Sequence, residues 1–118
     1  MSKKILIIDD EEGIRESLKL ILEDNYDIIL AENPAQGIDI IEKSKDVSLI
    51  LIDIKMPKMN GLEALKQIKE KRPDIKVIFV TGYKSVETAS EAAHLGANGY
   101  ITKPFKPAEI LEAVKKNF

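Results

Sequence analysis

Residues 49–53 read Leu-Ile-Leu-Ile-Asp, and residues 5–10 read Ile-Leu-Ile-Ile-Asp-Asp. Each apolar run is too short for a helix, and each is followed by one or two aspartates. A continuous apolar run of this length is typical of a strand buried on both faces, as in a parallel sheet covered by helices. If the two strands are neighbours, the carboxylates of Asp9, Asp10 and Asp53 meet at one edge of the sheet.

Carboxylates gathered in this way repel one another unless a cation or a proton neutralises them. A hard divalent cation such as Mg²⁺ prefers oxygen ligands and retains several waters. Asp10 and Asp53 can bind such an ion directly, with Asp9 holding a water. Asp53 can then attack a phosphorus atom to give an aspartyl phosphate, because the metal offsets the repulsion between carboxylate and phosphoryl group.

The rest of the chain alternates strand patterns with helical periods. The predicted strands cover about residues 4–8, 27–31, 49–53, 76–80 and 99–102. This alternation predicts an α/β fold: a doubly wound five-stranded parallel sheet with helices on both faces. With strand order 2-1-3-4-5, the switch point lies between the first and third strands, where such sheets bind ligands.

Two of the predicted helices bear on function. The fourth, about residues 85–95, carries mostly small apolar side chains. A helix that buries little is held weakly, so this one is a candidate for motion. The last helix begins at Pro107, and its expected buried stripe consists of Ile110, Leu111 and Val114.

Composition narrows the class of protein. The 118 residues suit one domain, 1–118, with one hydrophobic core. A net charge of -2 without a long basic run argues against nucleic-acid binding. The chain has no cysteine, which excludes disulfides, thiolate catalysis and zinc–cysteine sites. The N-terminal apolar run is too short for a signal peptide or a membrane span, and we expect a cytoplasmic protein.

Two further side chains end predicted strands. Thr81 follows the fourth strand and offers a hydroxyl, and Lys103 follows the fifth and offers an ammonium; both suit phosphoryl oxygens. Taken singly, a lysine is usually solvated and an acid after a strand is usually a loop residue. Three acids, a threonine and a lysine, all at strand ends, make that structural interpretation improbable.

The motifs of this chain resemble those of a known family. The chain is similar throughout to the receiver domain of bacterial two-component response regulators, which has a flavodoxin-like fold. The resemblance rests on five separated motifs in the expected order: Ile7–Glu11, Asp53–Gly61, Val80–Gly82, Gly96–Ala97 and Tyr100–Phe105.

The resemblance implies a phosphorylation switch rather than an enzyme. Asp53 would accept phosphate from the phosphohistidine of a sensor histidine kinase. Asp9 and Asp10 would hold Mg²⁺ together with Asp53, and the backbone carbonyl of Lys55 would be a further ligand.

The resemblance also implies how the signal leaves the site. Thr81 would move to the phosphoryl group, Tyr100 would rotate inward behind it, and Lys103 would pair with the phosphoryl oxygens, with a cis peptide bond between Lys103 and Pro104. The surface formed by the fourth helix, the fifth strand and the last helix would then change. That surface would control an output domain or effector protein, and it is also where a homodimer would form.

Two positions vary within the family and tune how fast phosphate is lost: Lys55, two residues after Asp53, and Tyr83, two after Thr81. Because both side chains are large and close to the site, we expect them to shield the phosphoryl group partly from water.

Two other functions compete. A Mg²⁺-dependent phosphohydrolase resembling haloacid dehalogenases would need an acid at position 55, where this chain has Lys55. A flavodoxin-like cofactor binder would need a first loop rich in glycine and hydroxyl groups, whereas residues 9–12 are all acidic and would repel phosphate.

The stretch from Val86 to Ala97 is similar to receivers of nitrogen-regulation-type transcription activators. We therefore expect either the receiver of such a longer regulator or a stand-alone receiver.

Overall fold

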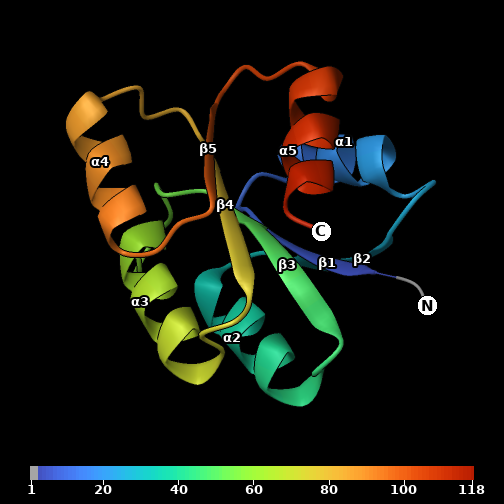
Figure 1. The fold of residues 1–118 in the computed structure, drawn as a ribbon, viewed down its shortest axis with the longest axis horizontal. Helices are drawn as coiled ribbons and strands as arrows, with labels where there is room; N and C mark the ends of the chain where they lie inside the picture. The colour runs from blue at the N-terminus through green and yellow to red at the C-terminus, as the bar shows by residue number, and fades with distance from the viewer. Residues whose placement is uncertain (1–2) are drawn as a thin grey trace.

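The computed structural model describes residues 3–118, in which parallel strands alternate with helices (Figure 1). The strands are β1 (Lys4–Ile8), β2 (Asp27–Ala31), β3 (Val47–Ile52), β4 (Lys76–Thr81) and β5 (Gly99–Thr102). The helices are α1 (Glu12–Leu22), α2 (Pro34–Lys43), α3 (Gly61–Lys71), α4 (Val86–His94) and α5 (Pro107–Lys116).

The strands form one five-stranded parallel sheet in the order β2-β1-β3-β4-β5, which confirms the predicted topology. In the pairing of β1 with β3, Ile8 is the register partner of Ile52. Asp9 and Asp53 are the next residues of their chains, so they leave the sheet at the same level. The register therefore brings the two acidic strand ends together, as expected for a switch point.

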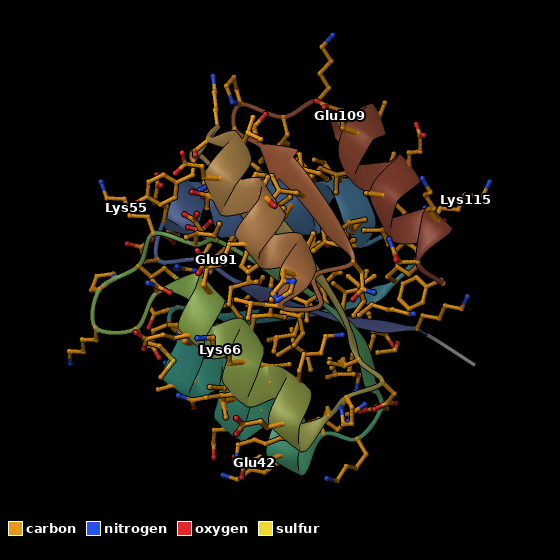
Figure 2. All side chains as sticks on the ribbon, turned by 60° about the vertical axis from the view of Figure 1, so that its left-hand side comes forward. Glu42, Lys55, Lys66, Glu91, Glu109 and Lys115 are labelled. Carbon is orange, nitrogen blue, oxygen red and sulfur yellow. The ribbon has the colours of Figure 1, made fainter. Side chains whose placement is uncertain are left out.

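Alternate residues of the central strands pack against different helices. Leu49 and Leu51 of β3 belong to one core with α1 and α5, whereas Ile50 and Ile52 belong to the other core with α2, α3 and α4. Figure 1 shows these two helix layers on opposite sides of the sheet. Charged residues such as Lys66 lie on the exposed sides of the helices (Figure 2).

Local sequence signals fix several helix starts. The side chain of Asn33 accepts a hydrogen bond from the Gln36 amide at 2.9 Å, with Pro34 at the first helical position of α2. In α4, only Ala92 is buried, whereas Val86 is 83% exposed. The expectation that α4 buries little is confirmed.

The structure differs from the sequence predictions at three places. β3 begins at Val47 rather than 49 and ends at Ile52, so Asp53 lies just beyond the strand. β4 extends one residue further, to Thr81. The prediction that Leu111 is buried was wrong: it is 37% exposed. Ile110 already faces the sheet, and the next residue of a helix is rotated by about 100° from it.

Candidate functional site

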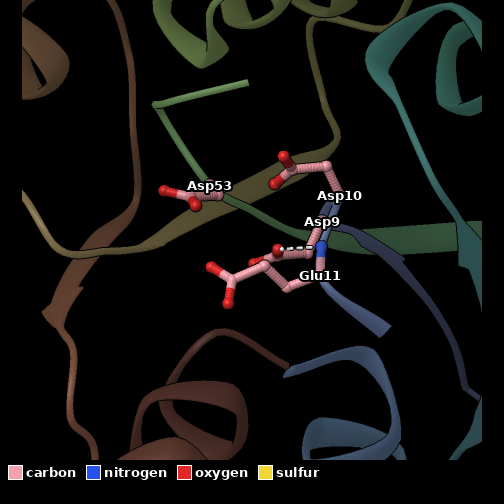
Figure 3. A group of neighbouring side chains, drawn as sticks. All are labelled: Asp9, Asp10, Glu11 and Asp53. Carbon is pink, nitrogen blue, oxygen red and sulfur yellow. Dashed lines mark hydrogen bonds between the residues drawn. The ribbon is translucent and has the colours of Figure 1, made fainter. Parts of the chain in front are cut away.

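Four acidic residues gather at the carboxyl ends of β1 and β3 (Figure 3). One carboxylate oxygen from each of Asp9, Asp10, Glu11 and Asp53 lies within 4.8 Å of the others. Asp9 is 1% exposed and Asp53 is 5% exposed, whereas Asp10 and Glu11 are open to solvent. The predicted meeting of three carboxylates is thus present, with Glu11 as a fourth.

Lys103 provides the cation of this cluster. Its Nζ donates to Asp9 Oδ2 at 3.0 Å and to Asp53 Oδ2 at 3.0 Å, and it lies 3.7 Å from Glu11 Oε1. The peptide bond between Lys103 and Pro104 is cis. Lys103 therefore bridges the two buried carboxylates from the end of a different strand.

Burial and charge act against each other on these groups. Burial raises the pKa of the Asp9 carboxyl, and the Asp53 charge raises it further. Hydrogen bonds from the Glu11 amide and from Lys103 lower that pKa but do not cancel the effect of burial. For Lys103, burial lowers the pKa, but its bonds to Asp53 and Asp9 outweigh this and leave the pKa raised. Lys103 therefore stays charged while Asp9 is drawn toward its neutral form, as expected in a crowded acidic cluster.

A cavity of about 760 Å³ opens beside this cluster. Asp53 lines it together with Thr81, and Lys55 and Tyr83 lie at its wall. Thr81 is fully buried, and its Oγ1 accepts the Tyr83 amide at 3.4 Å. The Lys55 amide donates to Asp53 Oδ1 at 3.4 Å. The residues lining the cavity are Asp10, Glu11, Asp53, Lys55, Met56, Pro57, Thr81, Gly82, Tyr83 and Lys103.

Tyr100 lies outside the lining of this cavity, but it is linked to the cavity wall. Its hydroxyl donates to the backbone carbonyl of Tyr83 at 2.8 Å, and its ring centroid lies 6.2 Å from that of Phe79. Burial raises the pKa of the Tyr100 hydroxyl, and the charge of Asp53 adds to this. Tyr83 belongs to the loop after β4, so this hydrogen bond connects Tyr100 directly to that loop.

The turn after β3 depends on a glycine. The Gly61 amide donates to the Ile54 carbonyl at 2.7 Å, which brings the start of α3 against the backbone that carries Asp53. A Cβ at position 61 would overlap the Asp53 carbonyl oxygen and lie 2.8 Å from Ile54 Cα. Only glycine allows this approach.

One half-buried cation beside the site, Arg15, was not predicted from the sequence. Its Nη1 donates to the backbone carbonyl of Asp9 at 2.7 Å from the first turn of α1. The position of Arg15 in the sequence is itself informative, because the positive end of a helix disfavours a cation in the first turn. An arginine placed there indicates a specific acceptor.

Comparison with known proteins agrees with this geometry. The model of the response regulator receiver domain family matches residues 5–115. Sporulation initiation phosphotransferase F of Bacillus subtilis (strain 168) is 40% identical over 117 residues, covering 98% of this chain and 94% of that protein.

Solved structures agree as well. A CheY-like receiver domain protein from Methanospirillum hungatei JF-1 has a TM-score of 0.92 at 40% identity, covering 98% of this chain and 93% of the other. The beryllofluoride-activated NtrC4 receiver domain dimer has a TM-score of 0.92 at 36% identity, covering 98% of this chain and 96% of the other.

A parallel sheet of this order with acids at its switch point and a matching family model define one class: the chain belongs to the response regulator receiver domain family. It is a phosphorylation switch, a phosphoacceptor rather than a classical enzyme. Membership implies a histidine kinase as partner, and the acidic cluster is typical of the receiver metal site. Within residues 3–118, none of the helices combines the length and apolarity needed to cross a membrane.

Proposed function

We propose that Asp53 is the phosphoacceptor and that a sensor histidine kinase is the donor. A carboxylate oxygen of Asp53 forms a bond to phosphorus while the P–N bond of phosphohistidine breaks. The departing imidazole keeps the electron pair of that bond and takes up a proton. The observation that supports this best is the bridging of Asp53 and Asp9 by Lys103 beside an open cavity.

The donor set fits Mg²⁺, which we propose as the cofactor. Its ligands would be the carboxylates of Asp9, Asp10 and Asp53 and the backbone carbonyl of Lys55, all of them oxygen atoms. Mg²⁺ is commonly held by one or two carboxylates together with substrate phosphate and water. When bound, it offsets the repulsion between the Asp53 carboxylate and the incoming phosphoryl group.

The remaining site residues would convert phosphorylation into a change of surface. A phosphoryl group adds roughly one to two negative charges and new acceptor oxygens. We propose that Lys103 and the Thr81 hydroxyl bind these oxygens. Moving Thr81 displaces the loop whose Tyr83 carbonyl holds Tyr100, so Tyr100 turns inward. Reversing a one-to-ninety-nine equilibrium needs about 5.5 kcal/mol, much of which charge-assisted hydrogen bonds can supply.

The α4–β5–α5 surface is the proposed output of the switch. α4 is held by few buried side chains, and Val86 is 83% exposed there, which suits an element with two arrangements. Its partner would be an output domain or an effector protein. Homodimerisation through this surface is a further proposal, supported by the similarity to a receiver solved as a dimer.

We also propose that 1–118 is a single receiver domain, supported by the family match to residues 5–115 and by the single sheet. We propose the cytoplasm as the location of phosphotransfer, because the proposed kinase partner would draw on cellular ATP.

The test uses acetyl phosphate as a small phosphodonor. We expect the chain to incorporate up to one phosphoryl group in Mg²⁺ and to lose this labelling in chelator, as measured by intact mass. D53N should abolish the labelling, whereas D24N, which changes an exposed carboxylate outside the site, should label normally. Labelling of D53N at the wild-type level would contradict the proposal, and many turnovers per chain would favour a phosphohydrolase.

The lifetime of the aspartyl phosphate should depend on Lys55 and Tyr83. Both line the cavity that contains Asp53. Replacing both with alanine opens the phosphoryl group to water, so we expect the phosphate half-life to shorten several-fold after the phosphodonor is removed. K84A serves as the control, because Lys84 is exposed and lies outside the cavity lining. An unchanged half-life in the double variant would contradict this shielding role.

A further inference from the structure

A half-buried arginine contacts the backbone of the acidic loop. The side chain of Arg15 is only 11% exposed, and its Nη1 donates to the Asp9 carbonyl oxygen at 2.7 Å. Its Nη2 lies 3.8 Å from Glu32 Oε1, in the loop between β2 and α2. The two ends of the guanidinium thus connect the loop after β1 with the loop after β2.

From this contact we infer that Arg15 is a positioning residue of the metal site: it orients the peptide group between Asp9 and Asp10 so that both carboxylates are set for a divalent cation. The inference rests on the Mg²⁺ site proposed above and adds a residue that touches neither the cation nor the phosphoryl group.

The other polar atoms of Asp9 are already held. Its amide donates to the Ala31 carbonyl at 3.2 Å, its Oδ1 accepts the Glu11 amide at 2.9 Å, and its Oδ2 accepts Lys103. The carbonyl oxygen is the atom that Arg15 fixes. Because a peptide group is planar, fixing this oxygen also fixes the direction in which the chain enters Asp10.

Asp10 needs this constraint more than Asp9 does. Asp9 is buried, whereas Asp10 is exposed and follows directly after the peptide group that Arg15 holds. A carboxylate that is free to sample several directions loses entropy on binding a cation. Holding the peptide group lowers that loss before the cation arrives, which is the usual effect of a group that orients a metal ligand.

Charge and position predict opposite results when Arg15 is removed. A nearby positive charge repels Mg²⁺, so its loss alone should tighten cation binding. Loss of the oriented peptide group should weaken binding. A weaker affinity in the neutral variant therefore identifies positioning as the role of Arg15.

Arg72 offers a matched control. Its side chain is 14% exposed, its Nη2 donates to the Val47 carbonyl at 2.9 Å, and its Nε lies 3.7 Å from Asp74 Oδ1. Like Arg15, it contacts a backbone carbonyl and a carboxylate, but it follows α3 and contacts the amino end of β3, away from the acidic cluster. R72M should therefore destabilise the fold as R15M does, without affecting the metal site.

The experiment is a calorimetric titration of the full chain with MgCl₂, together with melting curves at several Mg²⁺ concentrations. We expect R15M to bind Mg²⁺ roughly tenfold more weakly than wild type. Its Mg²⁺-dependent rise in Tm should be smaller as well. R72M should lose a similar amount of Tm but keep the wild-type affinity. Equal affinities in R15M and wild type, or an equal loss in R72M, would overturn the inference.

If R15M does not fold, R15K provides a second variant, which keeps the positive charge. A single ammonium replaces the guanidinium and keeps the charge that repels Mg²⁺, so we expect the affinity of R15K for Mg²⁺ to be clearly below that of wild type. Wild-type affinity in R15K would overturn the inference. A wild-type chain that does not bind Mg²⁺ overturns the proposed metal site and this inference with it, whereas the other outcomes leave the metal site intact.

Discussion

K103M is expected to lower the free energy of unfolding by about 3 kcal/mol when no Mg²⁺ is present. Lys103 donates to two carboxylates, Asp9 and Asp53, that are 1% and 5% exposed. Removing one partner of a buried ion pair leaves the other charges without compensation. The pKa of Asp9 is already raised by burial, so proton uptake there will limit the loss. Urea unfolding in chelator measures the change.

Mg²⁺ should restore much of this stability, because a cation bound by the same carboxylates replaces the missing ammonium. The difference in unfolding free energy between wild type and K103M should therefore shrink as Mg²⁺ is added. Labelling by acetyl phosphate should still slow by about a hundredfold, since the phosphoryl oxygens lose a preorganised cation. K66M, at an exposed position of α3, is the charge-matched control and should change neither property. Wild-type stability of K103M in chelator would show that Lys103 is not the compensating charge.

The fold could be predicted because a strand that is buried on both faces has a continuous apolar run in its sequence. Residues 4–8, 27–31 and 99–102 are strands as predicted, and continuous apolar runs fixed the central positions of β1, β3 and β4. The acids at the strand ends were equally predictable, since parallel strands present their carboxyl ends at one edge.

The differences arise where distant parts of the chain decide the outcome. Val47 joins β3 because it pairs with Lys4, across a shift in register that the apolar run does not reveal. The bond between Lys103 and Asp9 joins residues 94 positions apart, so no local pattern reports it. Arg15 is only six positions from Asp9 and was missed for a different reason: its acceptor is a backbone carbonyl, which every residue has.

Gly61 was part of a predicted motif, but its physical role comes from the packing. It is the first residue of α3, and Asn60 caps that helix by accepting the Glu63 amide at 3.0 Å. The backbone at Gly61 lies so close to the segment after β3 that an added Cβ would overlap the Asp53 carbonyl oxygen. The turn therefore joins the helix start to Asp53, the proposed phosphoacceptor, without a side chain between them.

G61A should accordingly affect stability and phosphorylation together. The added Cβ would lie 2.8 Å from Ile54 Cα and 2.9 Å from the Phe79 ring, in addition to the overlap with the Asp53 carbonyl oxygen. Backbone atoms cannot move aside as the end of a side chain can, so we expect a loss of about 3 kcal/mol in unfolding free energy. Because the atoms that must shift carry Asp53, the rate of labelling by acetyl phosphate should fall as well.

G13A provides the opposite control, since Gly13 lies in α1 and nothing is within 4 Å of its added Cβ. Alanine favours a helix over glycine by up to about 1 kcal/mol, so G13A should raise the free energy of unfolding and leave labelling unchanged. Urea unfolding and acetyl phosphate labelling of both variants separate the two effects. A G61A protein that is as stable as G13A would show that the turn can open without cost. If G61A is destabilised but labels at the wild-type rate, the contact supports the fold alone, and the position of Asp53 does not depend on it.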